Sequence, residues 1–331
     1  MDKDNNVIEI LKKGFQSSIQ GNYRYNYFGQ GIPPSGPMDE YSHHMGNILV
    51  NNNPEAPSIE LTLIGDKIRF LKETIFAVTG AFENAKLNNE IISAWRTYRV
   101  TEGDILELGF AKNGCRGYLS IAGGFNVPVV LESTSTYVRG SIGGYRGRFL
   151  AGEDILQDSQ PSIDSLIQLE NLMVTKEAIY YPGEENILYI TLGPQADLVK
   201  EKSILEFFNS EWIVSMKMDR VGIRFTGPQF FFKNRIKDSS EGKDLSNIID
   251  DGIPIGGMQI PSGKEIICMA RDGVSAGGFV KIGTVVTVSL NILGQLVPGK
   301  KIRFKEISLK EAREKLAQKR AMCSVNYIRK I

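Results

Sequence analysis

Alternating apolar and polar residues dominate the chain and predict short β-strands. Residues 59–81, IELTLIGDKIRFLKETIFAVTGA, contain two or three such runs, broken at Gly65-Asp66 and Lys72-Glu73. The alternation continues through residues 97–125. Strands this short and regular favour barrels or sandwiches over a parallel α/β sheet. We therefore expect a mainly β protein with few helices.

The second half of the chain repeats this alternation in residues 186–194, 212–228, 264–270 and 281–293. Polar and turn residues interrupt it between about 155 and 185, which indicates a domain boundary. We expect an N-terminal domain over residues 1–165 and a C-terminal domain over residues 166–331. This boundary is approximate, and strands are free to cross over it.

Helical periodicity is confined to a few segments. One helix is expected from Asp39 to about Asn51, and a second from Gly193-Pro194 to about Phe208. The C-terminal segment begins with the capping-box pattern Ser308-x-x-Glu311, which predicts a third helix.

Two short segments of the first half are similar in sequence to segments of the second half. GIPPSGPMD at 31–39 is similar to GIPIGGMQ at 252–259, and AGGFNVPVV at 122–130 is similar to AGGFVKIGTVV at 276–286. The order is the same but the spacing differs. Two related barrels with different insertions, or chance similarity between glycine-rich turns, both explain this pattern.

Composition narrows the function classes. The 39 basic and 38 acidic residues leave a net charge of +1, which gives no electrostatic case for nucleic acid or a membrane surface. The 3 cysteines have no metal-ligand spacing and suit reduced thiols. No signal peptide and no apolar run of about 18 residues is present. We expect a cytoplasmic protein without a metal site.

Two cofactor motifs are missing. No GxxxxGK[ST] phosphate loop occurs, and the Met-Lys-Met of SMKMDR (215–220) reads as a strand rather than as a biotin-carrying hairpin tip. The chain alone is therefore expected to bind no cofactor. Its two histidines, His43 and His44, are neighbours that cannot face one metal ion from a helix. We read them as one surface and one interface histidine, or as a single general base.

The paired glycines Gly123-Gly124 and Gly277-Gly278 are better candidates for a site. Glycine pairs after a strand permit either a bulge or the close approach of a ligand. Hydroxyl-bearing residues and Arg139 follow the first pair, while Asp272 and Lys281 flank the second. Such groups suit a small amide or carboxylate compound.

Several motifs together resemble one known family. They are GIPPSGPMDEYSHHMGN, YLSIAGGFNVPVVLESTSTY, IGGYRGRFLAGEDIL, TLGPQ, MDRVGIRFTGP, IGGMQIPSGKEI and AGGFVKIGTVV. In this order, over about residues 20–305, they resemble the biotin-dependent carboxyltransferase domain family. Its members are also called allophanate hydrolase subunit 2, the C subunit of 5-oxoprolinase, or Kip-inhibitor antagonist.

The resemblance implies two cyclophilin-like β-barrel domains and a partner subunit of related fold. It implies one component of an ATP-dependent 5-oxoprolinase that opens 5-oxoproline to glutamate, together with a lactam-hydrolase-like subunit. ATP would be used by the complex, and biotin would be needed only with a carboxylase partner. Two alternatives stay open. One is a regulatory protein that antagonises a Kip-type kinase inhibitor, and the other is carboxyl transfer from carboxybiotin to urea or a related amide.

The resemblance also supplies positions for a site. Asp39, Asp272 and Lys281 are the expected catalytic residues. The expected substrate-binding residues are Ser35, Gly36, Gly123, Gly124, Arg139, Gln259, Gly277 and Gly278. Three runs depart from the family pattern: Asp272–Ala276 replaces acid-Arg-Gln-Thr-Thr, Phe279–Lys281 replaces Tyr-Pro-Lys, and Asp250–Gly252 replaces Ser-Glu-Gly. Together these departures remove an arginine and two hydroxyls. The altered run from 272 to 280 favours the regulatory alternative.

Overall fold

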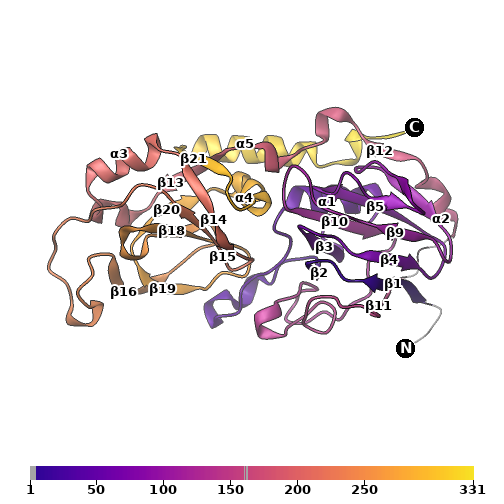
Figure 1. Cartoon of the computed structure of the whole chain (residues 1–331), viewed down its shortest axis with the longest axis horizontal. Helices are drawn as coiled ribbons and strands as arrows, with labels where there is room; N and C mark the ends of the chain where they lie inside the picture. Colours follow the sequence, from indigo (N-terminus) through magenta and orange to yellow (C-terminus); the bar gives the residue numbers. More distant parts are fainter. Residues whose placement is uncertain (1–4, 160, 162) are drawn as a thin grey trace. The chain divides into compact units, whose positions relative to one another are not determined.

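The computed structural model describes residues 5–159, 161 and 163–331 (Figure 1). The chain forms two compact units. Unit 1 contains the chain up to Arg24, Ser35–Glu184 and Arg320–Ile331, and unit 2 contains Tyr25–Pro34 and Glu185–Lys319. A short segment near the N-terminus therefore belongs to unit 2, and the C-terminal segment belongs to unit 1.

Unit 1 is built on two antiparallel sheets, drawn mostly in indigo and purple in Figure 1. The first has the strand order β11-β1-β4-β9-β6-β7, with β1 (Asn6–Lys12), β4 (Lys67–Phe70), β6 (Lys86–Leu87), β7 (Glu90–Ile91), β9 (Ile105–Glu107) and β11 (Ile155–Gln157). The second has the order β2-β3-β10-β5-β8, with β2 (Gln16–Gln20), β3 (Ser58–Thr62), β5 (Thr74–Gly80), β8 (Thr97–Val100) and β10 (Arg116–Ile121). Unit 1 also holds α1 (Glu40–Leu49), α2 (Ile163–Gln168) and the pair β12 (Leu172–Val174) and β22 (Ile328–Lys330).

Strand β5 explains how unit 1 is layered. Successive side chains of a strand point to opposite faces, and all residues of β5 are buried. Phe76 and Val78 belong to the core that the two sheets share. Ile75 and Ala77 belong to a second core, which also includes apolar residues of α1. The second sheet is thus covered on one face by the first sheet and on the other by α1.

Unit 2 contains a closed barrel with the strand order β13-β20-β17-β18-β15-β14-β21. Its strands are β13 (Ile187–Leu192), β14 (Trp212–Met218), β15 (Gly222–Thr226), β17 (Gly257–Gln259), β18 (Glu265–Met269), β20 (Lys281–Val285) and β21 (Lys301–Glu306). A separate pair joins β16 (Asn247–Gly252) to β19 (Ala276–Phe279). The helices are α3 (Glu201–Asn209), α4 (Thr287–Gln295) and α5 (Leu309–Met322), whose last residues belong to unit 1.

A cluster of aromatic side chains fills part of unit 2. Phe207 of α3 stacks on Phe304 of β21, with ring centroids 4.8 Å apart, and Trp212 stacks on Phe230 at 5.6 Å. The indole N–H of Trp212 donates to the carbonyl oxygen of Phe207 at 3.0 Å. This bond satisfies the polar end of a fully buried side chain, so the cluster gains apolar burial without an orphaned donor.

The mainly β fold predicted from the sequence is confirmed. Residues 59–81 contain β3, β4 and β5, and α1 occupies most of the segment predicted as the first helix. The capping box at Ser308 also forms, because Glu311 N–H donates to Ser308 Oγ at 3.2 Å and Ser308 N–H donates to Glu311 Oε2 at 3.1 Å.

One finer expectation was wrong. The helix predicted from residue 194 to 208 is broken into a 3-10 turn (Pro194–Leu198) and α3, because Val199 and Lys200 are extended. The first pair of similar segments forms two different structures. Residues 31–39 lead into α1, whereas residues 252–259 lead from β16 into β17. Of the two explanations for the similar sequences, this difference favours chance similarity between turns.

In the described part of the chain, no helix combines the length and the apolar character that crossing a bilayer requires.

Gly283 of β20 is predicted to be essential for barrel closure. A Cβ at this position would lie 2.3 Å from the backbone oxygen of Thr191 on β13, and backbone atoms cannot move aside cheaply. We expect Gly283→Ala to lower the free energy of unfolding by about 1–3 kcal/mol, measured by urea denaturation. Gly252→Ala is the control, since no atom lies within 4 Å of its Cβ, and a similar loss in both variants would contradict the prediction.

Candidate functional site

The loop that precedes α1 is held by buried side chains of unit 1. Ser35 and Gly36 have φ angles of 54° and 84°, so both occupy the left-handed region. A Cβ on Gly36 would lie 2.2 Å from the Tyr23 ring. The N–H of Gly36 donates to Gln20 Oε1 at 3.1 Å. The hydroxyl of Ser35 is buried, with no hydrogen-bond partner among the described residues.

Asp39 is the N-cap of α1. Its Oδ1 accepts from the N–H of Ser42 at 3.2 Å, and its Oδ2 accepts from the Ser42 hydroxyl at 2.6 Å. Its own N–H donates to the hydroxyl oxygen of Tyr118 at 2.8 Å, and Tyr118 donates to Glu60 Oε2 at 2.8 Å. Burial, reinforced by the nearby carboxylates, raises the pKa of Tyr118 well above its usual value. Asp39 thus has a clear role in stabilising the helix, and its catalytic role stays a prediction.

His43 is neither a surface histidine nor an accessible base. The side chain is fully buried, and its Nε2 lies 3.1 Å from the carbonyl oxygen of Gln20. The His43 and Tyr118 rings form a T-shaped contact, with their centroids 5.4 Å apart. Burial lowers the pKa of His43 to about 3, so the imidazole is neutral at physiological pH. His43 is buried where α1 packs onto β5 and β10, whereas His44 is partly exposed, a distinction that the sequence alone leaves open.

The first glycine pair forms a turn after β10. Gly123 and Gly124 have φ angles of 82° and 71°, which favour glycine. The N–H of Gly123 donates to Asn52 Oδ1 at 2.9 Å. The hydroxyls of residues 133–136 mostly bind the backbone of residues 19–22, and Arg139 is exposed on a short 3-10 turn.

A polar cluster in unit 2 links β20, β16 and the turn after β13. Lys281 Nζ donates to Asp251 Oδ2 at 2.8 Å, and Gln195 Nε2 donates to the same oxygen at 2.9 Å. The backbone N–H of Lys281 donates to Gln195 Oε1 at 2.9 Å. The bond from Lys281 is the main reason why the pKa of Asp251 lies below its usual value. The cluster therefore holds a fixed ammonium beside a partly exposed carboxylate.

Gln259 lies beside this cluster, since it is the β17 register partner of Lys281. Its side chain is 4% exposed, and its Nε2 has no hydrogen-bond partner among the described residues. A Cβ on Gly277 would lie 2.8 Å from that Nε2, and a Cβ on Gly278 would lie 2.7 Å from Asp250 Oδ1. The second glycine pair thus allows an amide and a carboxylate to approach the backbone closely.

Asp272 forms a buried ion pair. Its Oδ2 accepts from Arg220 Nε at 3.0 Å and its Oδ1 accepts from Arg220 Nη2 at 3.1 Å. The Arg220 and Asp272 side chains are nearly inaccessible, at 7% and 5% exposure. Such a two-bond pair orients both groups and stabilises the turn between β18 and β19. A catalytic role for Asp272 stays a prediction.

Some of the predicted site residues form two groups, whereas Gly123, Gly124, Arg139 and Asp272 belong to neither. Unit 2 brings Gln259, Gly277 and Lys281 together, while Ser35, Gly36 and Asp39 belong to the buried network of unit 1. Gln195 and Asp251 were not singled out as site residues. The position of Gln195 in the TLGPQ motif was the only sequence feature that could have pointed to its place in this cluster. Within residues 5–159, 161 and 163–331, no cluster of His, Cys, Asp or Glu is arranged to hold a metal ion.

The buried neutral His43 predicts a pH-dependent stability. Between about pH 6.5 and 3 the unfolded chain binds a proton at this residue and the folded chain does not. The free energy of unfolding should therefore fall as the pH falls, and His43 should contribute a loss of about 2 kcal/mol between pH 7 and 5. Urea denaturation at both pH values should show this loss reduced in His43→Gln and retained in His44→Gln. An unchanged loss in His43→Gln would contradict the prediction.

The Arg220–Asp272 pair predicts a strong stability effect. Arg220→Met leaves a buried carboxylate without its cation, and we expect it to lower the free energy of unfolding by about 3–5 kcal/mol. The double variant Arg220→Met/Asp272→Leu removes both charges and should recover most of this loss, as measured by thermal and urea unfolding. If the double variant is as unstable as Arg220→Met, the uncompensated charge is not the cause.

Comparisons with known proteins agree with this structure. The chain is 37% identical to a urea amidolyase of Lachancea kluyveri over 93% of its length, but it spans only 17% of that protein. It is 32% identical to the 5-oxoprolinase C subunit of Haemophilus influenzae, over 92% of this chain and 93% of that one. The crystal structure of the K. lactis urea amidolyase matches 99% of this chain with a TM-score of 0.90 and 36% identity, over 20% of its own length.

The family model described as "Carboxyltransferase domain, subdomain A and B" matches residues 30–306, which include the loop before α1, the polar cluster around Lys281 and every strand of the unit 2 barrel. The chain belongs to the carboxyltransferase domain family, as its sequence motifs predicted.

Proposed function

We propose that the chain is the carboxyltransferase-like subunit of an ATP-dependent 5-oxoprolinase complex, which opens 5-oxoproline to glutamate with partner subunits. The observation that carries the proposal is the similarity to the Haemophilus influenzae 5-oxoprolinase protein, which extends over 93% of that protein. ATP would be used by the complex, and its partners would be a subunit of related cyclophilin-like fold and a lactam-hydrolase-like subunit.

The chemistry of the unit 2 cluster supports a lactam substrate. A lactam presents a carbonyl acceptor and an N–H donor side by side. Gln259 offers a buried amide whose N–H₂ group has no partner among the described residues, which is suited to a carbonyl oxygen. Lys281, oriented by Asp251, supplies positive charge for an oxygen that becomes negative when the ring opens. Gly277 leaves the space beside Gln259 free of a side chain.

A second candidate is carboxyl transfer from carboxybiotin to urea or a related amide. The 37% identity to a urea amidolyase supports it. Urea also presents a carbonyl oxygen beside N–H groups, so the same Gln259 amide suits it. This reaction needs a biotinylated carboxylase as a partner, whereas the 5-oxoprolinase reaction does not.

The proposal predicts a specific effect of Gln259. In a complex reconstituted from this chain and its partner subunits, ATP-dependent glutamate release from 5-oxoproline should fall about 100-fold in Gln259→Leu, because one hydrogen bond to the reacting oxygen is lost. Gln318→Leu changes an exposed glutamine of α5 and should retain activity. Binding of each variant to the partner subunits is measured in parallel.

The outcomes separate the alternatives. If the complete complex forms and releases no glutamate, the 5-oxoprolinase proposal fails. ATP turnover that depends on urea and on an added biotinylated carboxylase would then support the second candidate. Partner binding without turnover on either substrate would support the regulatory role.

A further inference from the structure

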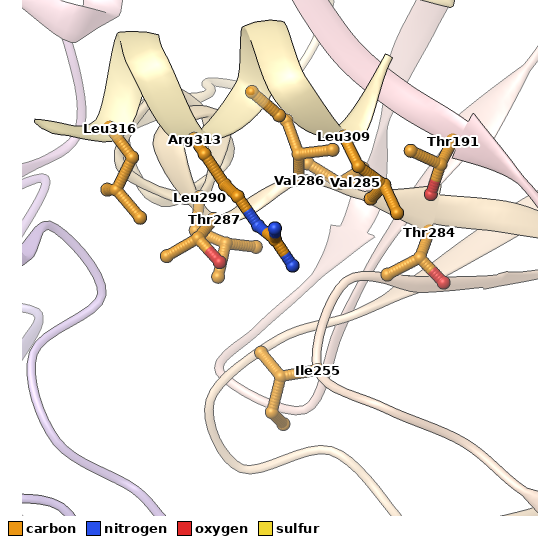
Figure 2. Close-up of a pocket in the computed structure, with 11 residues that line it drawn as sticks. Thr191, Ile255, Thr284, Val285, Val286, Thr287, Leu290, Leu309, Arg313 and Leu316 are labelled. Carbon is orange, nitrogen blue, oxygen red and sulfur yellow. The ribbon is translucent and has the colours of Figure 1, made fainter. Parts of the chain in front are cut away.

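Unit 2 contains a cavity that is separate from the polar cluster around Lys281. Its volume is about 310 Å³, which lies at the lower end of the range for small-molecule sites. Residues of β13, β20, α4 and α5 line it, together with Ile255 from the loop before β17 (Figure 2). The family match ends at residue 306, so the α5 wall of the cavity lies outside the matched region.

The α5 wall is anchored to the barrel. The capping box of Ser308 and Glu311 orders the first turn, Ala312 is buried, and Lys315 Nζ lies 5.2 Å from the centroid of the Tyr189 ring on β13. The first turns of the helix are therefore held in place over the strands that they face.

Arg313 is the charged group of this cavity. Figure 2 shows its side chain extending from α5 toward the space between Thr287, Thr284 and Ile255. Among the residues that the structure describes, no carboxylate pairs with this guanidinium, whereas Arg220, Arg148 and Arg224 each have a carboxylate partner. Arg313 is an exposed residue. A guanidinium that extends over an apolar wall and has no carboxylate partner among the described residues suits a carboxylate ligand, which it can bind with two hydrogen bonds.

The remaining lining restricts the ligand further. Three hydroxyls are available from Thr191, Thr284 and Thr287, and the other lining residues are apolar: Ile255, Val285, Val286, Leu290, Leu309, Ala312 and Leu316. None of the lining residues is acidic, so nothing in the cavity balances an ammonium group. An amino acid would place its ammonium beside Arg313 with no carboxylate in the lining to balance it, whereas an aliphatic acid would place its chain on the leucines and its carboxylate on Arg313.

We propose that this cavity binds a small aliphatic monocarboxylate that carries no ammonium group, with Arg313 as its anchor. The proposal does not depend on the 5-oxoprolinase reaction, because the cavity shares no residue with the Gln259 and Lys281 cluster.

Three ligands with one carbon skeleton test the proposal on the full chain. 4-Methylpentanoate carries the carboxylate, 4-methylpentanamide replaces it by a neutral amide, and leucine adds an ammonium group. Isothermal titration should give saturable binding of 4-methylpentanoate at millimolar concentration. It should give affinities at least about tenfold weaker for the other two, since each loses a charge-assisted bond or leaves a charge unpaired.

Two variants of α5 locate the site. Arg313→Gln should weaken 4-methylpentanoate binding at least about tenfold, and Arg313→Lys should retain part of the affinity. Lys310→Gln removes an exposed charge from the same helix outside the cavity and should bind as the wild type does. Methyl NMR signals of Leu290, Leu316 and Ile255 should shift on addition of the ligand. Failure of 4-methylpentanoate to saturate, equal binding of the amide, or unchanged affinity in Arg313→Gln would each overturn the proposal.

Discussion

The pairing of β20 with two neighbours is the constraint on which the functional part of unit 2 depends. On one side β20 pairs with β13, with Thr284 opposite Thr191 and Gly283 opposite Leu192. On the other it pairs with β17, where Lys281 faces Gln259. Only glycine fits at position 283, because the backbone of β13 approaches it too closely for a Cβ. The ladder therefore fixes both Lys281 at the start of β20 and Thr284 near its end.

Two chemically different environments result along this one strand. At the Lys281 end, an ammonium, a carboxylate and two amides lie close together, which suits a small polar amide. At the Thr284 end, a guanidinium and hydroxyls border an apolar wall, which suits an aliphatic acid. The first environment lies within the part of the chain that matches the family, and the second is completed by a helix that begins after that match.

Unit 1 uses its polar residues differently. Gln20, Glu60 and Tyr118 take up the backbone N–H groups of Gly36, Met38 and Asp39, and this holds the loop before α1 rigid. Burial in this network also keeps His43 neutral. The side chains of Gln20, Glu60 and Tyr118 therefore serve to hold the loop, while the Ser35 hydroxyl and His43 Nδ1 have no hydrogen-bond partner among the described residues.

Much of the fold was predictable from local patterns. Alternation predicted β3, β4 and β5, helical periodicity predicted α1, and the capping box predicted the start of α5, because these features depend on residues close together in the chain. The motifs also predicted the family, and they included Gln259, Gly277 and Lys281, which lie close together in the structure. The roles of Asp251 and Gln195 were not predictable, since hydrogen bonds between residues 30 to 86 positions apart leave no periodic pattern.

The sequence by itself determined the strand-rich architecture, the family and the positions of the glycine turns, because propensity, alternation and motif order act locally. Only the tertiary structure decided which polar groups have hydrogen-bond or ion-pair partners within the protein and which are left to bind a ligand. It paired Asp272 with Arg220, buried His43 under α1, left the Gln259 amide without a partner among the described residues, and placed Arg313 over the barrel. The physical reason is that burial and hydrogen-bond partnership arise from contacts between distant segments, and these exist only once each unit has folded.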